Sequence, residues 1–176
     1  MSDPFEPALI GSIRAQYALP AYGRHGLGHW ARVLENGERL AGLTGARLDV
    51  VRLFAVFHDA CRHSEGYDPG HGVRGAALAR SLRGHGFSLD ESGMAQLERA
   101  CALHTRQLTD SDITVATCFD ADRLDLPRVD ITVDPARLAT DAARDPKIIA
   151  WGRDRAVRGT VMPASWKRMR VSGEAP

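Results

Sequence analysis

Apolar residues recur three or four places apart along most of this chain, which is the spacing of an amphipathic helix. Neither an alternating run of β-branched residues nor an Asn-Gly hairpin turn is present, so the pattern predicts no strands. The spacing predicts about six helices, over residues 24–41, 47–63, 70–84, 90–105, 112–126 and 146–156. The predicted fold class is therefore all-α, a helical bundle of about six or more helices.

Three Asp-Pro pairs mark where helical segments are expected to begin. Aspartate favours the N-cap, and proline is tolerated at the first helical position because its missing N–H has no intrahelical partner there. The pairs are Asp68-Pro69, Asp134-Pro135 and Asp145-Pro146. Ser88 and Glu91 have the spacing of a capping box before another helix. Turns are predicted at residues 42–45 and 83–86, where glycines cluster.

Length and composition are those of an ordinary soluble domain. The chain has 176 residues, of which 44% are hydrophobic, and a formal net charge of +1. We expect a single domain over residues 1–176, ending in a helical extension over 131–176 whose tail after Met162 is loosely docked. The balanced charge gives no reason to expect a nucleic acid polymer or a membrane as partner. The oligomeric state stays open.

Targeting signals and cysteine content favour the cytoplasm. The segment up to residue 12 lacks a basic stretch followed by an apolar one, so no signal peptide is expected. No apolar run approaches the length of a membrane span. Cys61, Cys101 and Cys118 have no metal-knuckle spacing, and we interpret them as small core residues in a reducing compartment. The expected location is therefore cytoplasmic.

One aspartate interrupts an apolar helical stripe. Val115, Phe119, Asp122 and Leu126 fall on one helical face, so the Asp122 side chain should point into the core. Asp120 lies about 200° around the same helix and cannot share that direction. Burying an unpaired carboxylate costs several kcal/mol. Asp122 therefore needs an arginine, a cap or a metal as partner.

Histidines and a second aspartate are also expected to point inward. An apolar run over residues 53–57 leads directly into His58 and Asp59. Three other predicted helices contribute His29, His71 and His104. A lone inward histidine is usually a hydrogen-bonded core residue, and this alternative applies to each one taken singly. Taken together, a shared divalent cation satisfies them all, and histidine nitrogens with carboxylate oxygens and no thiolate suit Mn, Fe, Ni, Co or Zn.

Three motifs, in their order along the chain, resemble the HD-domain superfamily of metal-dependent phosphohydrolases. They are the histidine of "HWARV", the dipeptide "HD" at the end of an apolar helix, and a later "ADRLD". The similarity covers residues 20–130 and implies an HD-domain-like helical bundle. It also implies one divalent metal held by His29, His58, Asp59 and Asp122. Asp120 and Asp125 are assigned to supporting or capping roles.

Some branches of the superfamily add two histidines between the HD pair and the last aspartate. His71 and His104 lie in that interval, and two roles stay open for them: a catalytic one, in contact with a phosphate or with the attacking water, or the binding of a second metal. By the same resemblance, Glu65 would orient or deprotonate the water, unless it is a solvated loop residue. Arg62 and Arg74 are candidates to hold phosphoryl oxygens, because an arginine fork pairs with two oxygens at once. The alternative for both arginines is solvated surface.

The predicted function is a metal-dependent phosphohydrolase that cleaves a nucleotide or another small phosphate ester with a metal-activated water. One alternative is a di-iron oxygenase of HD type, which a second iron at His71 and His104 would favour. Another is a regulatory module that binds a ligand or metal without turnover. Loss of a metal ligand would favour the module, and none of the four is missing. The expected partner is a small phosphorylated substrate, which no glycine-rich phosphate loop identifies.

Overall fold

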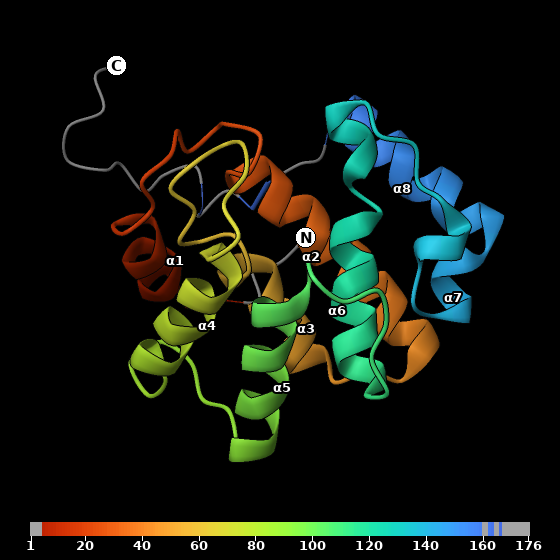
Figure 1. The fold of residues 1–176 in the computed structure, drawn as a ribbon. Coiled ribbons are helices and arrows are strands. Elements are labelled where there is room, and N and C mark those ends of the chain that lie inside the picture. The colour runs from red at the N-terminus through yellow and green to blue at the C-terminus, as the bar shows by residue number, and fades with distance from the viewer. Residues whose placement is uncertain (1–4, 160–161, 164–165, 167–176) are drawn as a thin grey trace.

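The predicted all-α fold is confirmed. In the computed structural model, the described residues are 5–159, 162, 163 and 166, and they form helices joined by loops, with no named strand among them (Figure 1). The helices are α1 (Pro7–Arg14), α2 (Leu27–Thr44), α3 (Leu48–Phe57), α4 (His71–Leu82), α5 (Glu91–Leu103), α6 (Ile113–Arg123), α7 (Asp141–Arg144) and α8 (Pro146–Arg158), with two short 3₁₀ helices, η1 (Leu126–Val129) and η2 (Pro135–Arg137).

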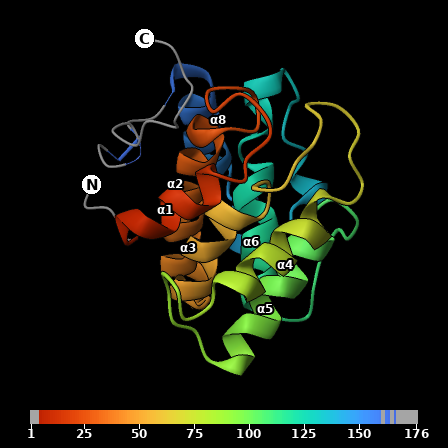
Figure 2. The ribbon, with the colours of Figure 1, turned by 90° about the vertical axis from the view of Figure 1, so that its left-hand side faces the viewer.

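Helices α2, α3 and α6 form the centre of the bundle and pack on one another. Helices α4 and α5 pack together and against α3 on one side, whereas α7 and α8 lie on the opposite side, against α2 and η1 (Figures 1 and 2). Segments that are far apart in the sequence therefore meet at α3. Side chains from α2, α4, α5 and α6 can reach the end of this one helix.

The core consists of a large cluster and a smaller one. The large cluster contains the fully buried side chains of Trp30, Phe54 and Phe119 between α2, α3 and α6. The smaller cluster joins Leu40 and Leu124 to residues of the 133–148 segment. Burial of this apolar surface, at about 25 cal/mol per Å², attaches the C-terminal helices to the bundle. The division of the chain into a core over 20–130 and an extension stays a prediction.

Two of the predicted Asp-Pro starts are confirmed, and one is wrong. The Asp145 and Asp134 carboxylates accept backbone N–H groups at the first turns of α8 and η2. Helix α4 instead begins at His71 with Gly70 as N-cap. The Asp68 carboxylate accepts from Arg74 and from the His63 backbone N–H, so it is not available to cap the helix.

The predicted capping box before α5 is also wrong. Helix α5 begins at Glu91, and the carboxylate of Asp90 accepts a 2.6 Å hydrogen bond from the Gly93 backbone N–H. Aspartate is as good an N-cap as serine. The cap therefore lies two residues later than Ser88, directly before the helix.

The helix that carries the His-Asp pair is shorter than predicted, and the sequence did not predict α1 and α7. Helix α3 ends at Phe57, His58 is its C-cap, and a turn follows through Cys61. Helix α2 begins at Leu27 rather than at residue 24, so His25 lies in the preceding loop. Helices α1 and α7 are only eight and four residues long. Such short segments offer too few periodic positions to be recognised.

The predicted loose docking of the tail after Met162 is wrong for Pro163 and Trp166, the two residues of this tail that the structure describes, because both are buried. Trp166 is fully buried, and its ring centroid lies 6.2 Å from that of Phe5. Residues 167–176 lie outside the described part of the chain. Burial of a tryptophan removes a large apolar area from water, so this contact ties the segment to the main core.

The structure describes the surroundings of the three cysteines and the apolar character of the helices. All three cysteines are free; Cys101 and Cys118 are buried, and Cys61 is partly buried. Burial raises the pKa of the Cys101 and Cys118 thiols, which agrees with their interpretation as core residues. Within the described ranges, no helix has both the length and the apolar character that a membrane crossing requires.

Candidate metal centre

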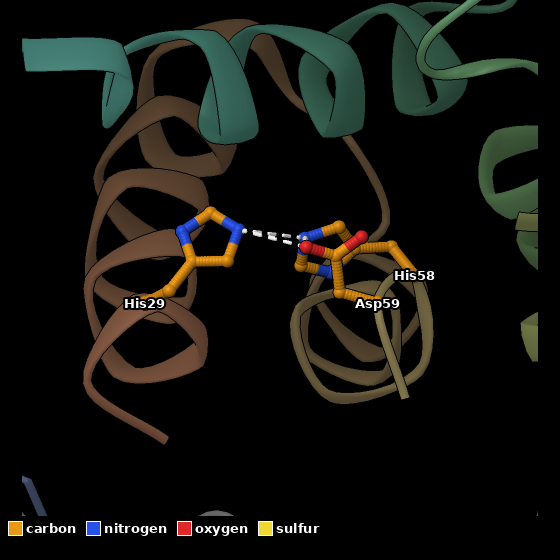
Figure 3. A group of neighbouring side chains, drawn as sticks. All are labelled: His29, His58 and Asp59. Atoms are coloured by element: carbon orange, nitrogen blue, oxygen red, sulfur yellow. Dashed lines mark hydrogen bonds and ion pairs between the residues drawn. The ribbon is translucent and has the colours of Figure 1, made fainter. Parts of the chain in front are cut away.

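His58 and Asp59 lie at the C-terminal end of α3 and are buried among the surrounding helices. The His29 ring reaches toward both of them from α2 (Figure 3). Its Nε2 atom lies 3.0 Å from Nε2 of His58 and 3.5 Å from Oδ2 of Asp59. The structure therefore brings together the three predicted ligands that precede residue 60.

The fourth predicted ligand, Asp122, faces the same point from α6. Its Oδ1 atom lies 3.4 Å from Nε2 of His29 and 3.9 Å from Nε2 of His58. The Asp122 side chain is 19% exposed to solvent, whereas the Asp59 side chain is 4% exposed. Asp122 thus approaches from the more open side of the group.

A second group lies on the other side of Asp59. Oδ1 of Asp59 lies 3.2 Å from Nε2 of His71 and 3.9 Å from Nε2 of His104. The two Nε2 atoms are 3.1 Å apart, and all three residues are buried. The Asp59 carboxylate therefore faces His29 and His58 with one oxygen, and His71 and His104 with the other.

The other ring nitrogen of each of these four histidines is already engaged. In three cases Nδ1 faces a backbone carbonyl oxygen, which can only accept a hydrogen bond. These contacts are His58 with Phe54 at 3.1 Å, His104 with Cys101 at 2.8 Å, and His71 with Asp68. His29 Nδ1 faces Oδ2 of Asp125 at 2.7 Å. The hydrogen therefore resides on Nδ1, and the lone pair of Nε2 points into the site.

Two pairs of Nε2 lone pairs thus face each other without a hydrogen between them. Burial lowers the pKa of His29 well below its ordinary value, lowers that of His71, and lowers that of His104 to about 4. At neutral pH His29, His71 and His104 therefore carry no added proton. Opposed lone pairs near 3 Å are unfavourable unless a cation lies close to both. The donor set, imidazole nitrogens with carboxylate oxygens, fits divalent transition metals.

The charge of Asp59 supports the same interpretation. Burial alone would raise its pKa, but the imidazoles of His58 and His104 and the Arg62 guanidinium lower it to about 2. Arg62 Nε donates a 3.0 Å hydrogen bond to Oδ1 of Asp59. Asp59 is therefore ionised at neutral pH and able to serve both groups.

Asp125 and Asp120 have the supporting roles predicted for them. Asp125 is buried and accepts from His29 Nδ1 and, at 2.6 Å, from Arg32 Nε. Burial raises the pKa of Asp125 to about 6, so it is ionised above this value and holds the His29 ring in one tautomer. Asp120 instead accepts from the backbone N–H groups of Ala139 and Thr140, which ties the segment before α7 to α6.

Two glycines allow α4 to bring His71 into the site. A Cβ on Gly75 would lie 2.2 Å from the carbonyl oxygen of Phe57, at the end of α3. A Cβ on Gly72 would lie 2.1 Å from the carbonyl oxygen of Cys101, on α5. Both distances are below any permitted contact. The glycines therefore determine how closely α4 passes the two neighbouring backbones, and so where His71 lies.

Glu65 forms a pair that the sequence did not predict. Its Oε2 atom lies 2.5 Å from Nδ1 of His25, and its side chain is one-third exposed. The His25 ring centroid lies 6.1 Å from that of His29. His25 and Glu65 belong to different loops, so no periodicity could pair them. The predicted role of Glu65 in orienting water stays a prediction.

Tyr17 is a further residue beside the site that the sequence did not indicate. Its hydroxyl is buried and has no hydrogen-bond partner among the described residues. Burial, together with the negative charges of Glu65 and Asp59, raises the pKa of the hydroxyl. The ring packs edge-on against Trp30, with centroids 5.2 Å apart. A buried hydroxyl without a partner is costly and calls for a functional or solvent partner.

The two predicted substrate-binding arginines differ in their surroundings. Arg62 is buried beside Asp59, and its Nη1 also donates to the backbone carbonyls of Ser64 and Gly66. Arg74 donates to the carbonyl of Cys61 and to the Asp68 carboxylate, so its guanidinium holds the loop between α3 and α4. Contact of either arginine with a substrate stays a prediction.

A comparison with solved structures finds a protein of the same fold. It is the crystal structure, at 1.45 Å resolution, of a predicted HD superfamily hydrolase from an uncultured Thermotogales bacterium. The TM-score is 0.62 and the sequences are 26% identical, over 85% of this chain and 86% of that chain. No family model matches this sequence. No curated protein matches it either.

The chain therefore has the fold of the HD superfamily, and the resemblance carried by its His-Asp motifs is confirmed. Two groups of histidines and aspartates in this fold have the arrangement of a metal site.

Proposed function

We propose that this protein is a metal-dependent phosphohydrolase that cleaves a nucleotide or another small phosphate ester. The observation that carries the proposal is the pair of facing imidazole sets on either side of Asp59. Their Nε2 atoms lie 3.0 Å apart in one set and 3.1 Å apart in the other. All four imidazoles are held in the tautomer that binds metal. The similarity to a protein described as a predicted HD superfamily hydrolase supports the same class of reaction.

Two ions fit the donor groups better than one. The first would be held by His29, His58, Asp59 and Asp122, and the second by Asp59, His71 and His104. This arrangement favours a metal role for His71 and His104 over direct contact with a phosphate. Divalent Mn, Fe, Ni, Co or Zn suits such a set. A divalent ion there would act as a Lewis acid and lower the pKa of a bound water toward neutrality.

Residues around the two groups suit the handling of a phosphate ester. The Glu65 carboxylate, paired with His25, would accept a proton from the attacking water or orient it. The Arg62 guanidinium, which already touches Asp59, would stabilise charge on the phosphoryl oxygens through Nη2, which donates to none of the described residues. The hydroxyl of Tyr17, which has no partner among the described residues, is a second hydrogen-bond donor on this side.

Metal content measured together with hydrolysis tests the proposal. Untagged protein is analysed by plasma mass spectrometry beside His58→Ala, with His85→Ala as a control because that histidine is exposed. We expect metal in the wild type and in the control, and its loss in His58→Ala. The metal-loaded protein should release phosphate from a panel of nucleotides and phosphate esters. Metal binding without any turnover on this panel would overturn the hydrolase proposal.

A di-iron oxygenase is the second candidate, and the shared Asp59 carboxylate between two imidazole pairs favours it. Two irons per chain, with oxygen consumed in the presence of a small polar substrate and no phosphate release, would select it. A regulatory module without turnover is less well supported, because all four predicted ligands of the first ion are present and converge.

A further inference from the structure

A cavity of about 380 Å³ opens beside the candidate metal centre. His71 lines it, and so does Arg62, which contacts Asp59. The cavity is therefore contiguous with the second imidazole pair. The remaining walls come from the loop before α4 and from the turn after α5. A volume of this size accommodates a small ligand, such as the alcohol part of a phosphate ester.

The charged groups on the cavity wall leave one cation without a counter-ion. Arg62 is paired with Asp59, and Asp68 is paired with Arg74. Arg106, the remaining charged side chain on the wall, forms no ion pair within the described part of the chain and donates one hydrogen bond, to the Pro69 carbonyl. An uncompensated guanidinium at the wall of a cavity attracts an anionic ligand.

An exposed aromatic ring lies on the same wall. Tyr67 is 90% exposed, although its ring is large and apolar, and it lies in the loop between α3 and α4. No ring contact of Tyr67 is present among the described residues, in contrast to Tyr17. A planar group that enters the cavity can therefore cover this ring without displacing another side chain. Stacking of a base on an aromatic side chain strengthens binding and depends little on which base is bound.

We propose that this cavity is the subsite for the leaving group of the substrate, in which Tyr67 stacks on a planar ring and Arg106 provides the positive charge. The substrate would then be a phosphate ester whose alcohol carries an aromatic ring, with its phosphate directed toward the metal centre. This inference rests on the proposed hydrolase function. It goes beyond that function by naming Tyr67 as the side chain that selects the alcohol and Arg106 as the one that attracts the anionic ligand.

Binding of two matched ligands tests the role of Tyr67. Adenosine 5′-monophosphate and ribose 5-phosphate differ in the ring, and each is titrated into metal-loaded protein by calorimetry as its phosphonate analogue, in which a P–C bond replaces the scissile P–O bond. We expect wild type to bind the nucleotide at least about 10-fold more tightly, which corresponds to 1.4 kcal/mol. Tyr67→Ala should remove this preference and leave ribose 5-phosphate unaffected, whereas Tyr67→Phe should keep it. Tyr22→Ala removes another exposed tyrosine, outside the cavity lining, and should bind as wild type does.

The role of Arg106 is tested by the affinities of the same two ligands for a variant without its charge. Arg106→Gln should weaken both ligands by a similar factor of about 5–10, because it removes charge rather than a stacking surface. The loss should shrink as salt increases. Arg137→Gln, which removes an exposed arginine outside the cavity lining, should leave both affinities unchanged.

The outcomes separate this inference from the proposed function. Ring-dependent binding that Tyr67→Ala abolishes, in a protein that hydrolyses neither ester, would support the subsite and overturn the hydrolase proposal. Hydrolysis of phosphate esters with equal affinity for both ligands, or with a Tyr67→Ala variant that behaves as wild type, would overturn the subsite alone. Absence of binding for both ligands would also overturn the subsite.

Discussion

Oδ1 of Asp59 lies 3.2 Å from Nε2 of His71, where the turn after α3 meets the first residue of α4 and the two helices pass nearly in contact. The other oxygen of the same carboxylate faces His29 at 3.5 Å. Asp59 is therefore shared between two sets of imidazole nitrogens. A carboxylate can serve two cations in this way because its two oxygens diverge, and the charge of a single Asp59 then contributes to both sites.

The shared position of Asp59 predicts that the two sets can be emptied separately. His104→Gln should lower metal content from about two ions to about one per chain, because the first set keeps all four of its ligands. Plasma mass spectrometry after dialysis against metal-free buffer measures this. His63→Gln is the matched control, because His63 also lies between the His58-Asp59 pair and Asp122 in the sequence but is exposed. Loss of all metal in His104→Gln would show that the two sets fill only together.

The two aspartates of α6 should respond to the same substitution in opposite ways. Asp122→Asn should lower metal affinity by 10-fold or more with little change in the stability of the metal-free protein, because its side chain faces the imidazoles. Asp120→Asn should keep metal and lower the free energy of unfolding by about 1–3 kcal/mol, because its carboxylate accepts two backbone N–H groups. Zinc competition titrations and urea unfolding measure the two effects. The reverse ranking would identify Asp120 as the ligand.

The glycines of α4 predict a stability contrast. Gly75→Ala should lower the free energy of unfolding by about 1–3 kcal/mol, because the new methyl group collides with the Phe57 carbonyl at 2.2 Å. Gly42→Ala is the control, since it lies in α2 with no atom within 4 Å of the added methyl. This change should stabilise by about 0.5–1 kcal/mol through helix propensity. Equal effects of the two changes in urea unfolding would contradict the close helix crossing.

Because the Tyr17 hydroxyl has no partner among the described residues, its removal should raise stability and lower activity. Tyr17→Phe removes a buried polar group without a protein partner, so the free energy of unfolding should rise by about 1 kcal/mol. If the hydroxyl assists catalysis as proposed, kcat for phosphate release should fall in the same variant. Urea unfolding and steady-state kinetics measure the two quantities. A loss of stability would show that the hydroxyl has a solvent partner in the folded state.

The metal-free protein should lose stability as pH falls below about 6.5, the pKa of histidine in an unfolded chain. Burial lowers the pKa of His29, His71 and His104 in the folded state. Between the folded and the unfolded pKa of each histidine, the unfolded state therefore binds more protons than the folded state. Stability therefore decreases with acidification and stops responding to His104 below its folded pKa of about 4. Urea unfolding at pH 7.5, 6.0 and 5.0, with chelator, measures the slope.

A variant provides the control for this pH dependence. His104→Gln should show a shallower slope over the same range, because one group that takes up a proton on unfolding is gone. Buried carboxylates whose pKa is lowered, such as Asp59, contribute only below about pH 4. Asp125, whose pKa burial raises to about 6, binds a proton first in the folded state and offsets the contribution of about one histidine between about pH 6 and 4. An unchanged stability from pH 7.5 to 5.0 would contradict the neutral, buried state of the imidazoles.

Local patterns in the sequence were sufficient to predict the helices and the inward direction of the ligands. Helical periodicity located the six longer helices α2 to α6 and α8, and it selected Asp122 as the aspartate that faces the imidazoles. The expectation that Asp120 points away from the core is wrong, because Asp120 is fully buried against the segment before α7. These features depend on the spacing of neighbouring residues along one helix, which the sequence contains directly. The order of the His-Asp motifs then indicated the superfamily whose fold the comparison of structures finds.

Contacts between distant segments depended on the tertiary structure. The sequence could not indicate that Glu65 meets His25, that Asp59 is shared between two imidazole pairs, or that Gly75 lets α4 approach α3. Each of these depends on how helices cross, and the crossing is decided by packing over the whole core. The sequence thus determined which side chains point inward, whereas the packing of the helices decided which of them meet.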